Sequence, residues 1–337
     1  MDFPNTRLFP ATAVADEQGR LHIGGCDTLE LAAEFGTPLY IFDEETLRHR
    51  CREFVREFTN RHPETTVVYA CKAFINRALA LLFHQEGLGL DVVSGGELAA
   101  ARSVDFPPSR VYFHGNNKSP QELQEALEWG IGRVVVDNLQ ELSLLEQLAG
   151  RLGRVQEILL RVSPGVDPHT HAHTTTGTLD SKFGLPIQTG QAEEAVRQAQ
   201  DAAHLKLVGL HFHLGSPVFE TEPYQVALGV VLEFAARLRE EGFHLQELSP
   251  GGGFAIAYTQ DQRPPSVADY AEAIVGTLGE HCQTLGMRLP RLIIEPGRAI
   301  VGPAGVALYR VGAVKTIPGV RTYVAVDGGM GDNIRPA

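Results

Sequence analysis

Residues 67–87 read VVYACKAFINRALALLFHQEG, and this stretch holds one complete strand–helix unit. The segment 67–74 is short, β-branched and apolar, which is typical of a buried strand, whereas 76–87 places its apolar residues at helical spacing. Lys72 interrupts the apolar run of the strand. A lysine is rarely fully buried unless it is paired or neutral, so Lys72 needs either a partner or a chemical role.

The same strand–helix unit recurs along most of the chain. Helix-like stretches with polar starts lie between most of the strand-like runs. Eight such alternations in about 235 residues favour a closed parallel (β/α)8 TIM-like barrel over an open doubly wound sheet. The seven further strand-like runs are 87–94, 110–116, 133–138, 157–165, 205–215, 245–253 and 291–300.

The two ends of the chain depart from this pattern. Residues 301–337 show turns but no helical spacing, which predicts a β-rich unit. The N-terminal segment 1–40 looks like strand–turn–strand, and we expect it to pair with that unit as a second, β-rich domain beside a barrel at 41–300. The strand-like VAVDGGM (324–330) lies so near the end that we expect the C-terminal part of this domain to be incomplete.

Composition restricts the kind of partner. The chain has 29 Lys+Arg against 41 Asp+Glu, a net charge of −12, which disfavours nucleic acid and anionic membranes and favours a small-molecule substrate. No run approaches the roughly 18 apolar residues of a membrane span, and the first 25 residues lack a signal-peptide core, so we expect a cytoplasmic protein. Four cysteines without a CxxC pair indicate neither a disulfide framework nor a structural zinc site.

The strand-like runs are interrupted near their carboxyl ends, where barrel enzymes place their active sites. The residues collected there are Lys72, Asp91, Ser94, His114, Asn116, Arg161, Ser163, His211, His213, Gly251, Gly252, Gly253, Glu295 and Arg298.

Together these residue types indicate a carbonyl cofactor that carries a phosphate. A lysine in a partly desolvated pocket can form a Schiff base with a carbonyl. The run SPGGGF (249–254) offers backbone N–H groups as a phosphate cradle after the seventh strand. Glu295 can keep a pyridine nitrogen protonated, His213 can stack on a ring, and Arg298 can meet a phosphate or carboxylate. The expected cofactor is pyridoxal 5′-phosphate.

Eight motifs carry a family resemblance over nearly the whole chain: YACKA (69–73), DVVSGGEL (91–98), HGNNKS (114–119), HTHAHTTTGTLDSKFGL (169–185), GLHFHLGS (209–216), GGGF (251–254), EPGR (295–298) and DGGM (327–330). With them the chain resembles the fold-type III pyridoxal-phosphate decarboxylases, most closely their diaminopimelate decarboxylase branch. The resemblance implies loss of CO2 from meso-2,6-diaminopimelate to give L-lysine, the last step of lysine biosynthesis. It also implies a homodimer with shared active sites.

The resemblance further implies a role for each matching residue. Lys72, His213 and Glu295 would be catalytic, and Arg298 and Arg335 would face the substrate carboxylates. The implied cofactor-binding set is Lys72, Asp91, His213, Ser216, Gly251, Gly252, Gly253, Glu295, Gly297 and Arg298.

Two departures from the family pattern bear on activity. Pro217 stands where the family usually has Gln. The chain ends at Ala337, two residues after Arg335, before the family's Tyr, its Cys-Glu-Ser motif and its late tyrosine. We therefore expect an incomplete chain that retains cofactor binding and has impaired turnover.

Alternative interpretations remain open at this point. One is a decarboxylase of another basic amino acid, namely ornithine, arginine or carboxynorspermidine, and another is a catalytically silent homologue that binds the cofactor. The alternating histidines of 169–173 indicate a loop that closes over the site rather than a metal site, and no metal is expected. We expect Lys118 to be a solvent-exposed charge in a loop and Arg161 to have a structural role. For Asp91, the alternative to a place near the cofactor is a hydrogen bond to loop amides.

Overall fold

The computed structural model describes residues 6–167 and 181–333. The chain divides into two compact units, one made of Met1–Arg50, Ala257–Gln262 and Ile300–Ala337, the other of Cys51–Ile256 and Arg263–Ala299. The domain limits near residues 40 and 300 stay a prediction.

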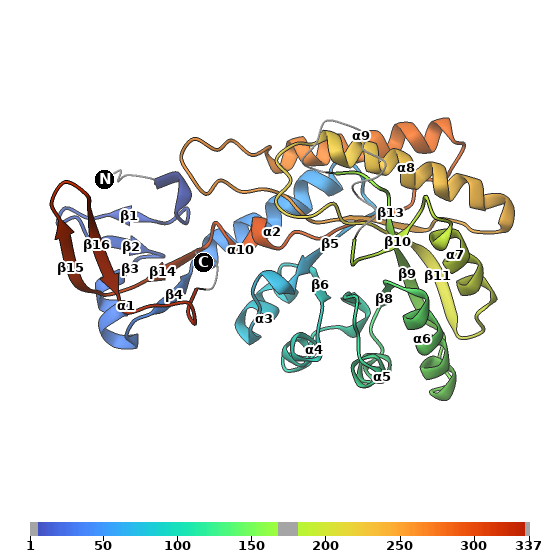
Figure 1. Ribbon diagram of the computed structural model, residues 1–337, viewed down its shortest axis with the longest axis horizontal. Coiled ribbons are helices and arrows are strands. Elements are labelled where there is room, and N and C mark those ends of the chain that lie inside the picture. The colour runs from blue at the N-terminus through green and yellow to red at the C-terminus, as the bar shows by residue number, and fades with distance from the viewer. Residues whose placement is uncertain (1–5, 168–180, 334–337) are drawn as a thin grey trace. The chain divides into compact units, whose positions relative to one another are not determined.

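The larger unit is a closed parallel barrel, as the sequence predicts (Figure 1). Each strand pairs in parallel with the next along the chain, and the pairing of the last strand with the first closes the ring. A short strand, β10 (Leu185–Pro186), adds to the edge of β9. The barrel strands are β5 (Thr65–Ala70), β6 (Gly89–Val92), β7 (Val111–Phe113), β8 (Arg133–Val136), β9 (Gln156–Ser163), β11 (Leu205–His211), β12 (Glu247–Gly251) and β13 (Arg291–Ile294).

Side chains from different strands fill this barrel. One fully buried cluster takes a residue from each of six strands, so the interior is a packed core rather than a pore. Its members are Val68, Tyr112, Val135, Leu159, Val208 and Ile293.

The helices between the strands begin where polar side chains can cap them. Asn76 and Asn138 each accept a hydrogen bond from the backbone N–H three residues on, and Ser119 forms a capping box with Glu122. Six helices match the predicted stretches: α3 (Arg77–Gln85), α4 (Gly95–Arg102), α5 (Pro120–Trp129), α6 (Leu139–Arg151), α7 (Gln191–Asp201) and α8 (Glu222–Leu238).

Two long helices are not among those predicted from the sequence: α2 (Glu44–Thr59) and α9 (Val267–Thr284). The C-terminal half of α2 packs against the barrel unit through Phe54 and Phe58, which are fully buried. The ring of Phe54 lies 5.2 Å from that of Phe254, centroid to centroid. Short helical turns complete the described part: α10 (Arg298–Val301), η1 (Thr6–Leu8), η2 (Cys71–Ala73), η3 (Pro108–Arg110) and η4 (Arg239–Glu241).

The smaller unit is β-rich, and it joins the two ends of the chain. Strand β4 pairs antiparallel with β14, which is the predicted pairing between N-terminal and C-terminal segments. The other strands form a three-stranded sheet and a separate hairpin. The elements are β1 (Val14–Ala15), β2 (Leu21–Ile23), β3 (Cys26–Asp27), α1 (Thr28–Phe35), β4 (Leu39–Phe42), β14 (Gly305–Leu308), β15 (Val311–Ile317) and β16 (Arg321–Val326). Within 6–167 and 181–333, no helix is both long and apolar enough to cross a membrane.

Close backbone packing inside the barrel predicts a matched pair of glycine substitutions. A Cβ at Gly209 of β11 would lie 1.9 Å from the Glu247 carbonyl oxygen, whereas one at Gly279 of α9 would meet no atom within 4 Å. Gly209→Ala should lower the free energy of unfolding by about 2 kcal/mol or more, and Gly279→Ala should raise it by about 0.5–1 kcal/mol. Urea unfolding measures both, and equal effects would contradict the described β11–β12 packing.

Candidate active site

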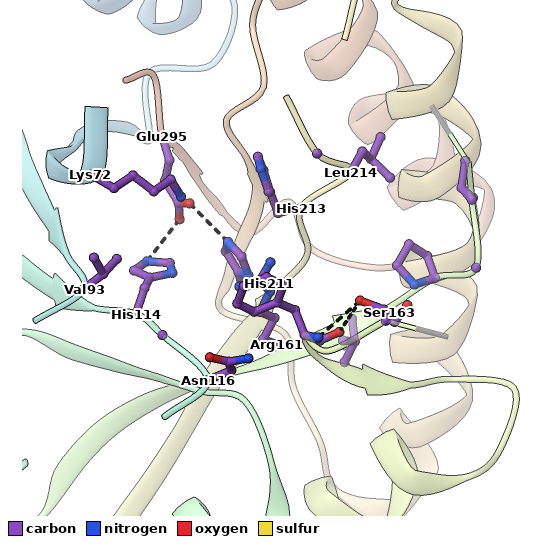
Figure 2. Close-up of a pocket in the computed structure, with 18 of the residues that line it drawn as sticks. Lys72, Val93, His114, Asn116, Arg161, Ser163, His211, His213, Leu214 and Glu295 are labelled. Carbon is purple, nitrogen blue, oxygen red and sulfur yellow. Dashed lines mark hydrogen bonds and ion pairs between the residues drawn. The ribbon is translucent and has the colours of Figure 1, made fainter. Parts of the chain in front are cut away.

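A pocket of about 820 Å³ opens at the carboxyl ends of the barrel strands (Figure 2). Its lining comes from the carboxyl ends of β9 and β11 and from the segments that follow β5, β6, β7, β9, β11 and β13, which are widely separated in the sequence. Of the residues collected from the sequence, it brings together Lys72, His114, Asn116, Arg161, Ser163, His211, His213 and Glu295, whereas Asp91, Ser94, Gly251, Gly252, Gly253 and Arg298 do not line it.

Lys72 does not lie in the strand that the sequence suggests. β5 ends at Ala70, and Lys72 lies on the turn Cys71–Ala73 just beyond it. The Lys72 side chain is 53% exposed, so the amine reaches into the pocket instead of being buried in the sheet. The prediction that Lys72 stands within a buried strand is therefore wrong, because the strand ends before it.

The carboxylate nearest to this amine is Asp91, at 3.8 Å between Lys72 Nζ and Asp91 Oδ2. Asp91 is completely buried, and neither carboxylate oxygen has a hydrogen bond within the described residues. Asp91 therefore does not bind loop amides, contrary to the interpretation above. Burial raises the pKa of Asp91 to about 7, although the charge of Lys72 opposes this rise.

Glu295 directly follows β13, and its buried carboxylate is surrounded by hydrogen-bond donors. Ser249 Oγ donates to Glu295 Oε1 at 2.8 Å, and His211 Nε2 lies 3.1 Å from Oε2. Burial opposes ionisation, but His211, His114 and the two hydrogen bonds outweigh it and hold the pKa of Glu295 well below its usual range. Glu295 is therefore an ionised carboxylate at the floor of the pocket.

The three histidines of the pocket are neutral near pH 7. Burial lowers the pKa of His114 and His211, and it lowers the pKa of His213 to about 3, assisted by the charges of Lys72 and Arg161. β11 ends at His211, so His213 lies in the following loop rather than on a shared strand face. A neutral imidazole in such a loop can stack on an aromatic ring.

The glycine run after β12 approaches other backbone so closely that no side chain would fit. A Cβ at Gly252 would lie 2.1 Å from the Glu295 carbonyl oxygen, and one at Gly253 would lie 2.5 Å from that of Gly215. A Cβ at Gly251 would touch the His213 ring at 2.8 Å. The run Gly251–Gly253 therefore forms a glycine wall packed tightly against neighbouring chain, and its role as a phosphate cradle stays a prediction.

The remaining predicted cofactor and substrate residues lie in loops or at a helix start after the strands, or outside the described chain. Ser216 is exposed in the loop whose Val218 bridges to Phe254, beside the glycine run. Gly297 packs against the Lys72 turn, because a Cβ there would lie 3.1 Å from Ala73 Cβ. Arg298 begins α10. Arg335 and the loop 169–173 lie outside the described residues.

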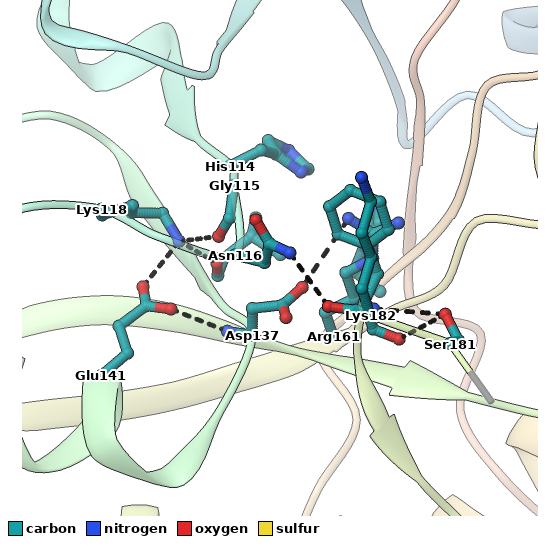
Figure 3. Close-up of polar contacts among 12 residues, drawn as sticks. His114, Gly115, Asn116, Lys118, Asp137, Glu141, Arg161, Ser181 and Lys182 are labelled. Atoms are coloured by element: carbon teal, nitrogen blue, oxygen red, sulfur yellow. Dashed lines mark hydrogen bonds and ion pairs between the residues drawn. The ribbon is translucent and has the colours of Figure 1, made fainter. Parts of the chain in front are cut away.

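Lys118 is buried, so its assignment as a solvated loop charge is wrong (Figure 3). Its ammonium donates to Glu141 Oε1 at 2.6 Å and to the carbonyl oxygens of Gly115 and Val135, both at 2.8 Å. These bonds satisfy the charge and hold the loop after β7 against β8. The pairing could not be read from the sequence because Lys118 lies in a loop and Glu141 lies 23 residues away on α6.

Arg161 and Asn116 line the far side of the pocket. The Arg161 guanidinium lies 3.8 Å from Asp137 Oδ1 and stacks over the ring of Phe183 at 4.4 Å from its centroid. Asn116 Nδ2 donates to the Lys182 carbonyl oxygen at 3.0 Å. The pocket wall is thus joined to the segment that begins at residue 181.

One cluster has the composition of a metal site. Ligand atoms of His114, His211 and Glu295 lie within 4.8 Å of one another. Both Glu295 oxygens, however, already accept hydrogen bonds, from Ser249 and His211. The expectation of no metal stays a prediction.

The raised pKa of Asp91 predicts a pH-dependent loss of stability. A carboxyl group with a folded-state pKa near 7 and a reference pKa of 3.8 stabilises the fold below pH 4, and this contribution is lost as pH rises towards 7. Asp91→Asn should therefore make the cofactor-free protein more stable than wild type at pH 8, on the order of several kcal/mol, but not at pH 4.

Urea unfolding from pH 4 to pH 8.5 measures this difference. The matched control is Asp201→Asn, at an exposed residue at the end of α7. A stability difference between Asp91→Asn and wild type that does not change with pH would contradict the burial of a carboxylate without hydrogen bonds.

Known proteins match both the sequence and the fold. Residues 44–302 match the family described as “Pyridoxal-dependent decarboxylase, pyridoxal binding domain”. A diaminopimelate decarboxylase of Bacillus subtilis is 46% identical over 97% of this chain and 74% of its own length, and one of Bacillus methanolicus is 44% identical over 98% and 76%. The crystal structure of diaminopimelate decarboxylase from M. jannaschii superposes with a TM-score of 0.90 at 36% identity, over 96% of this chain and 75% of that one.

A second M. jannaschii structure, of the same enzyme in complex with L-lysine, matches equally well, with a TM-score of 0.90 over 97% of this chain and 75% of that one. The barrel, the pocket and these matches lead to one conclusion: the chain belongs to the fold-type III pyridoxal-dependent decarboxylases, in their diaminopimelate decarboxylase branch.

Proposed function

We propose that this chain decarboxylates meso-2,6-diaminopimelate to L-lysine and CO2, the last step of lysine biosynthesis, with pyridoxal 5′-phosphate as its cofactor. The observation that carries this function is the convergence of the Lys72 amine and the ionised Glu295 carboxylate in one pocket. The relatives named above act as diaminopimelate decarboxylases, and one of their structures holds L-lysine.

The pocket fits the cofactor on each side. Lys72 supplies an amine for a covalent link, Glu295 a buried carboxylate for the ring nitrogen, and the neutral His213 a face for the ring. The bound cofactor supplies an electron sink for the carbon that loses CO2. Phosphate-binding roles are proposed for Ser216, Gly251, Gly252, Gly253, Gly297 and Arg298, with Asp91 beside the amine.

Each catalytic residue then acts through its own chemistry. Glu295, as an ionised carboxylate, holds a proton on the ring nitrogen and so strengthens the sink. His213 orients the ring without adding a positive charge, since burial keeps it neutral. The Lys72 amine lines the pocket and lies 3.8 Å from Asp91 Oδ2, so it would be available to attach the cofactor there.

Recognition of the substrate is proposed for Arg298 and Arg335, whose guanidinium groups suit carboxylates. A substrate with two carboxylates needs both, whereas ornithine or arginine does not. The family resemblance also leads us to propose a cytoplasmic homodimer with shared active sites.

The function is tested by adding pyridoxal 5′-phosphate and meso-diaminopimelate to the purified protein and measuring CO2 and lysine. Ornithine, arginine and carboxynorspermidine are the comparison substrates. We expect lysine from meso-diaminopimelate and at least tenfold less CO2 from the others. Preferential turnover of a substrate with one carboxylate would assign a different decarboxylase activity, and cofactor binding without any turnover would favour a silent homologue.

Lys72→Ala should abolish both the covalent attachment of the cofactor and the reaction, because among the described residues no other lysine lines the pocket. Borohydride reduction followed by peptide mapping detects the attachment. Lys206→Ala is the matched control, since Lys206 is an exposed partner of Glu157. An unchanged adduct in Lys72→Ala would sink the assignment.

Glu295→Gln should still bind the cofactor but lower kcat about 10²–10³-fold, because an amide cannot hold the ring nitrogen protonated. Steady-state kinetics at saturating cofactor measures the loss. Undiminished decarboxylation would count against the proposed role of Glu295.

A further inference from the structure

Glu295 is surrounded by side chains that have no role in the chemistry described so far. Ser249 lies on β12, His211 ends β11, and His114 directly follows β7, so three other strands supply its neighbours. All four side chains are buried. Figure 2 shows Glu295 between Lys72 and the pair His114 and His211.

Ser249 is held in one orientation. Its hydroxyl oxygen accepts a hydrogen bond from the Gly251 N–H at 3.1 Å, so its proton is free to point at Glu295 Oε1, 2.8 Å away. The Glu295 N–H in turn donates to the Gly251 carbonyl oxygen at 3.0 Å. The glycine wall and the carboxylate are therefore locked together through Ser249.

His211 is restricted to one tautomer by the same carboxylate. An ionised carboxylate only accepts hydrogen bonds, so His211 must carry its proton on Nε2 to donate to Glu295 Oε2 at 3.1 Å. Its Nδ1 is then a bare acceptor, and in the described structure that atom is buried without a partner. A buried acceptor without a hydrogen-bond partner costs free energy, so this arrangement lowers the stability of the fold.

His114 contributes in a weaker way. Its Nε2 lies 3.5 Å from Glu295 Oε1 and 3.8 Å from Asp91 Oδ1, beyond good hydrogen-bond length for either. Its ring meets that of His211 edge-on, with centroids 4.9 Å apart. The polar ring of His114 therefore lies between the two carboxylates without forming a good hydrogen bond to either of them.

We propose that His211 and Ser249 are positioning residues for the proposed decarboxylation: they donate one hydrogen bond to each oxygen of Glu295 and so keep that carboxylate ionised and aimed at the cofactor ring nitrogen. This inference rests on the proposed function. Burial alone favours the protonated form of a carboxyl group, and it raises the pKa of Asp91, which has no hydrogen-bond donor among the described residues, to about 7. A protonated Glu295 could not hold a proton on the ring nitrogen.

The test compares His211→Leu and Ser249→Ala with a conservative pair, His211→Gln and Ser249→Thr, which keep a donor. The matched control is His62→Asn, because His62 is also buried, lies before β5, and pairs its ring nitrogen Nε2 with the Pro290 carbonyl oxygen rather than with a carboxylate. Three quantities are measured in the cofactor-loaded protein: the pH at which the absorption spectrum of the bound cofactor changes, the cofactor Kd, and kcat against KM.

Loss of a donor should move the spectral transition by about one pH unit, weaken cofactor binding about tenfold and lower kcat about 10–100-fold, with KM little changed. Gln and Thr should restore most of each effect, and His62→Asn should change none. Other charged or titratable groups near Glu295 also contribute to the pH dependence of the absorption spectrum, so the same pH range is scanned for every variant. They are Lys72, Asp91, His114, Arg161 and His213.

Wild-type spectra, Kd and kcat in both His211→Leu and Ser249→Ala would overturn the inference. A kcat loss in both without any spectral change, not restored by Gln or Thr, would do so as well, since it would indicate a structural role only. If His211→Leu does not fold, Ser249→Ala decides alone. If the wild type binds the cofactor but releases no CO2, the proposed function fails while the spectral and affinity measurements still decide the inference.

Discussion

The parallel pairing of β13 with β5 is the constraint on which the site depends. It places Ile294 opposite Val67, although more than two hundred residues separate them, and it closes the barrel. Lys72 and Glu295 each follow one of these strands within a few residues. The N–H of Ala70 also donates to the Pro296 carbonyl oxygen at 3.2 Å, so the two loops are held together beyond the strands. Barrel closure therefore brings the amine and the carboxylate into one pocket.

At this end of the barrel, two buried carboxylates have pKa values that shift in opposite directions. Asp91 has no hydrogen-bond donor in the described structure, and burial raises its pKa to about 7. Glu295 is buried equally well but has Ser249 and His211 as donors, and its pKa is held low. The difference comes from the partners and not from the depth of burial.

Much of this architecture can be predicted from local sequence, because most barrel strands are short apolar runs, several of them β-branched, and several helices start at a capping Asn or Ser. α9 was missed because Gly276 and Gly279 interrupt its apolar pattern, and α2 because charged residues dominate it. The site residues at strand ends were predicted by position and residue type. Their partners were not, since Lys118–Glu141 and His211–Glu295 are contacts between distant segments that no spacing rule reveals.

The central claim is that Lys72 and Glu295 hold one cofactor between them, and a crystal structure of the protein with pyridoxal 5′-phosphate tests it most directly. The account predicts electron density continuous with Lys72 Nζ, a ring nitrogen about 3 Å from Glu295, and a phosphate against Gly251–Gly253. A cofactor bound elsewhere, or in this pocket with its ring nitrogen turned away from Glu295, would contradict it.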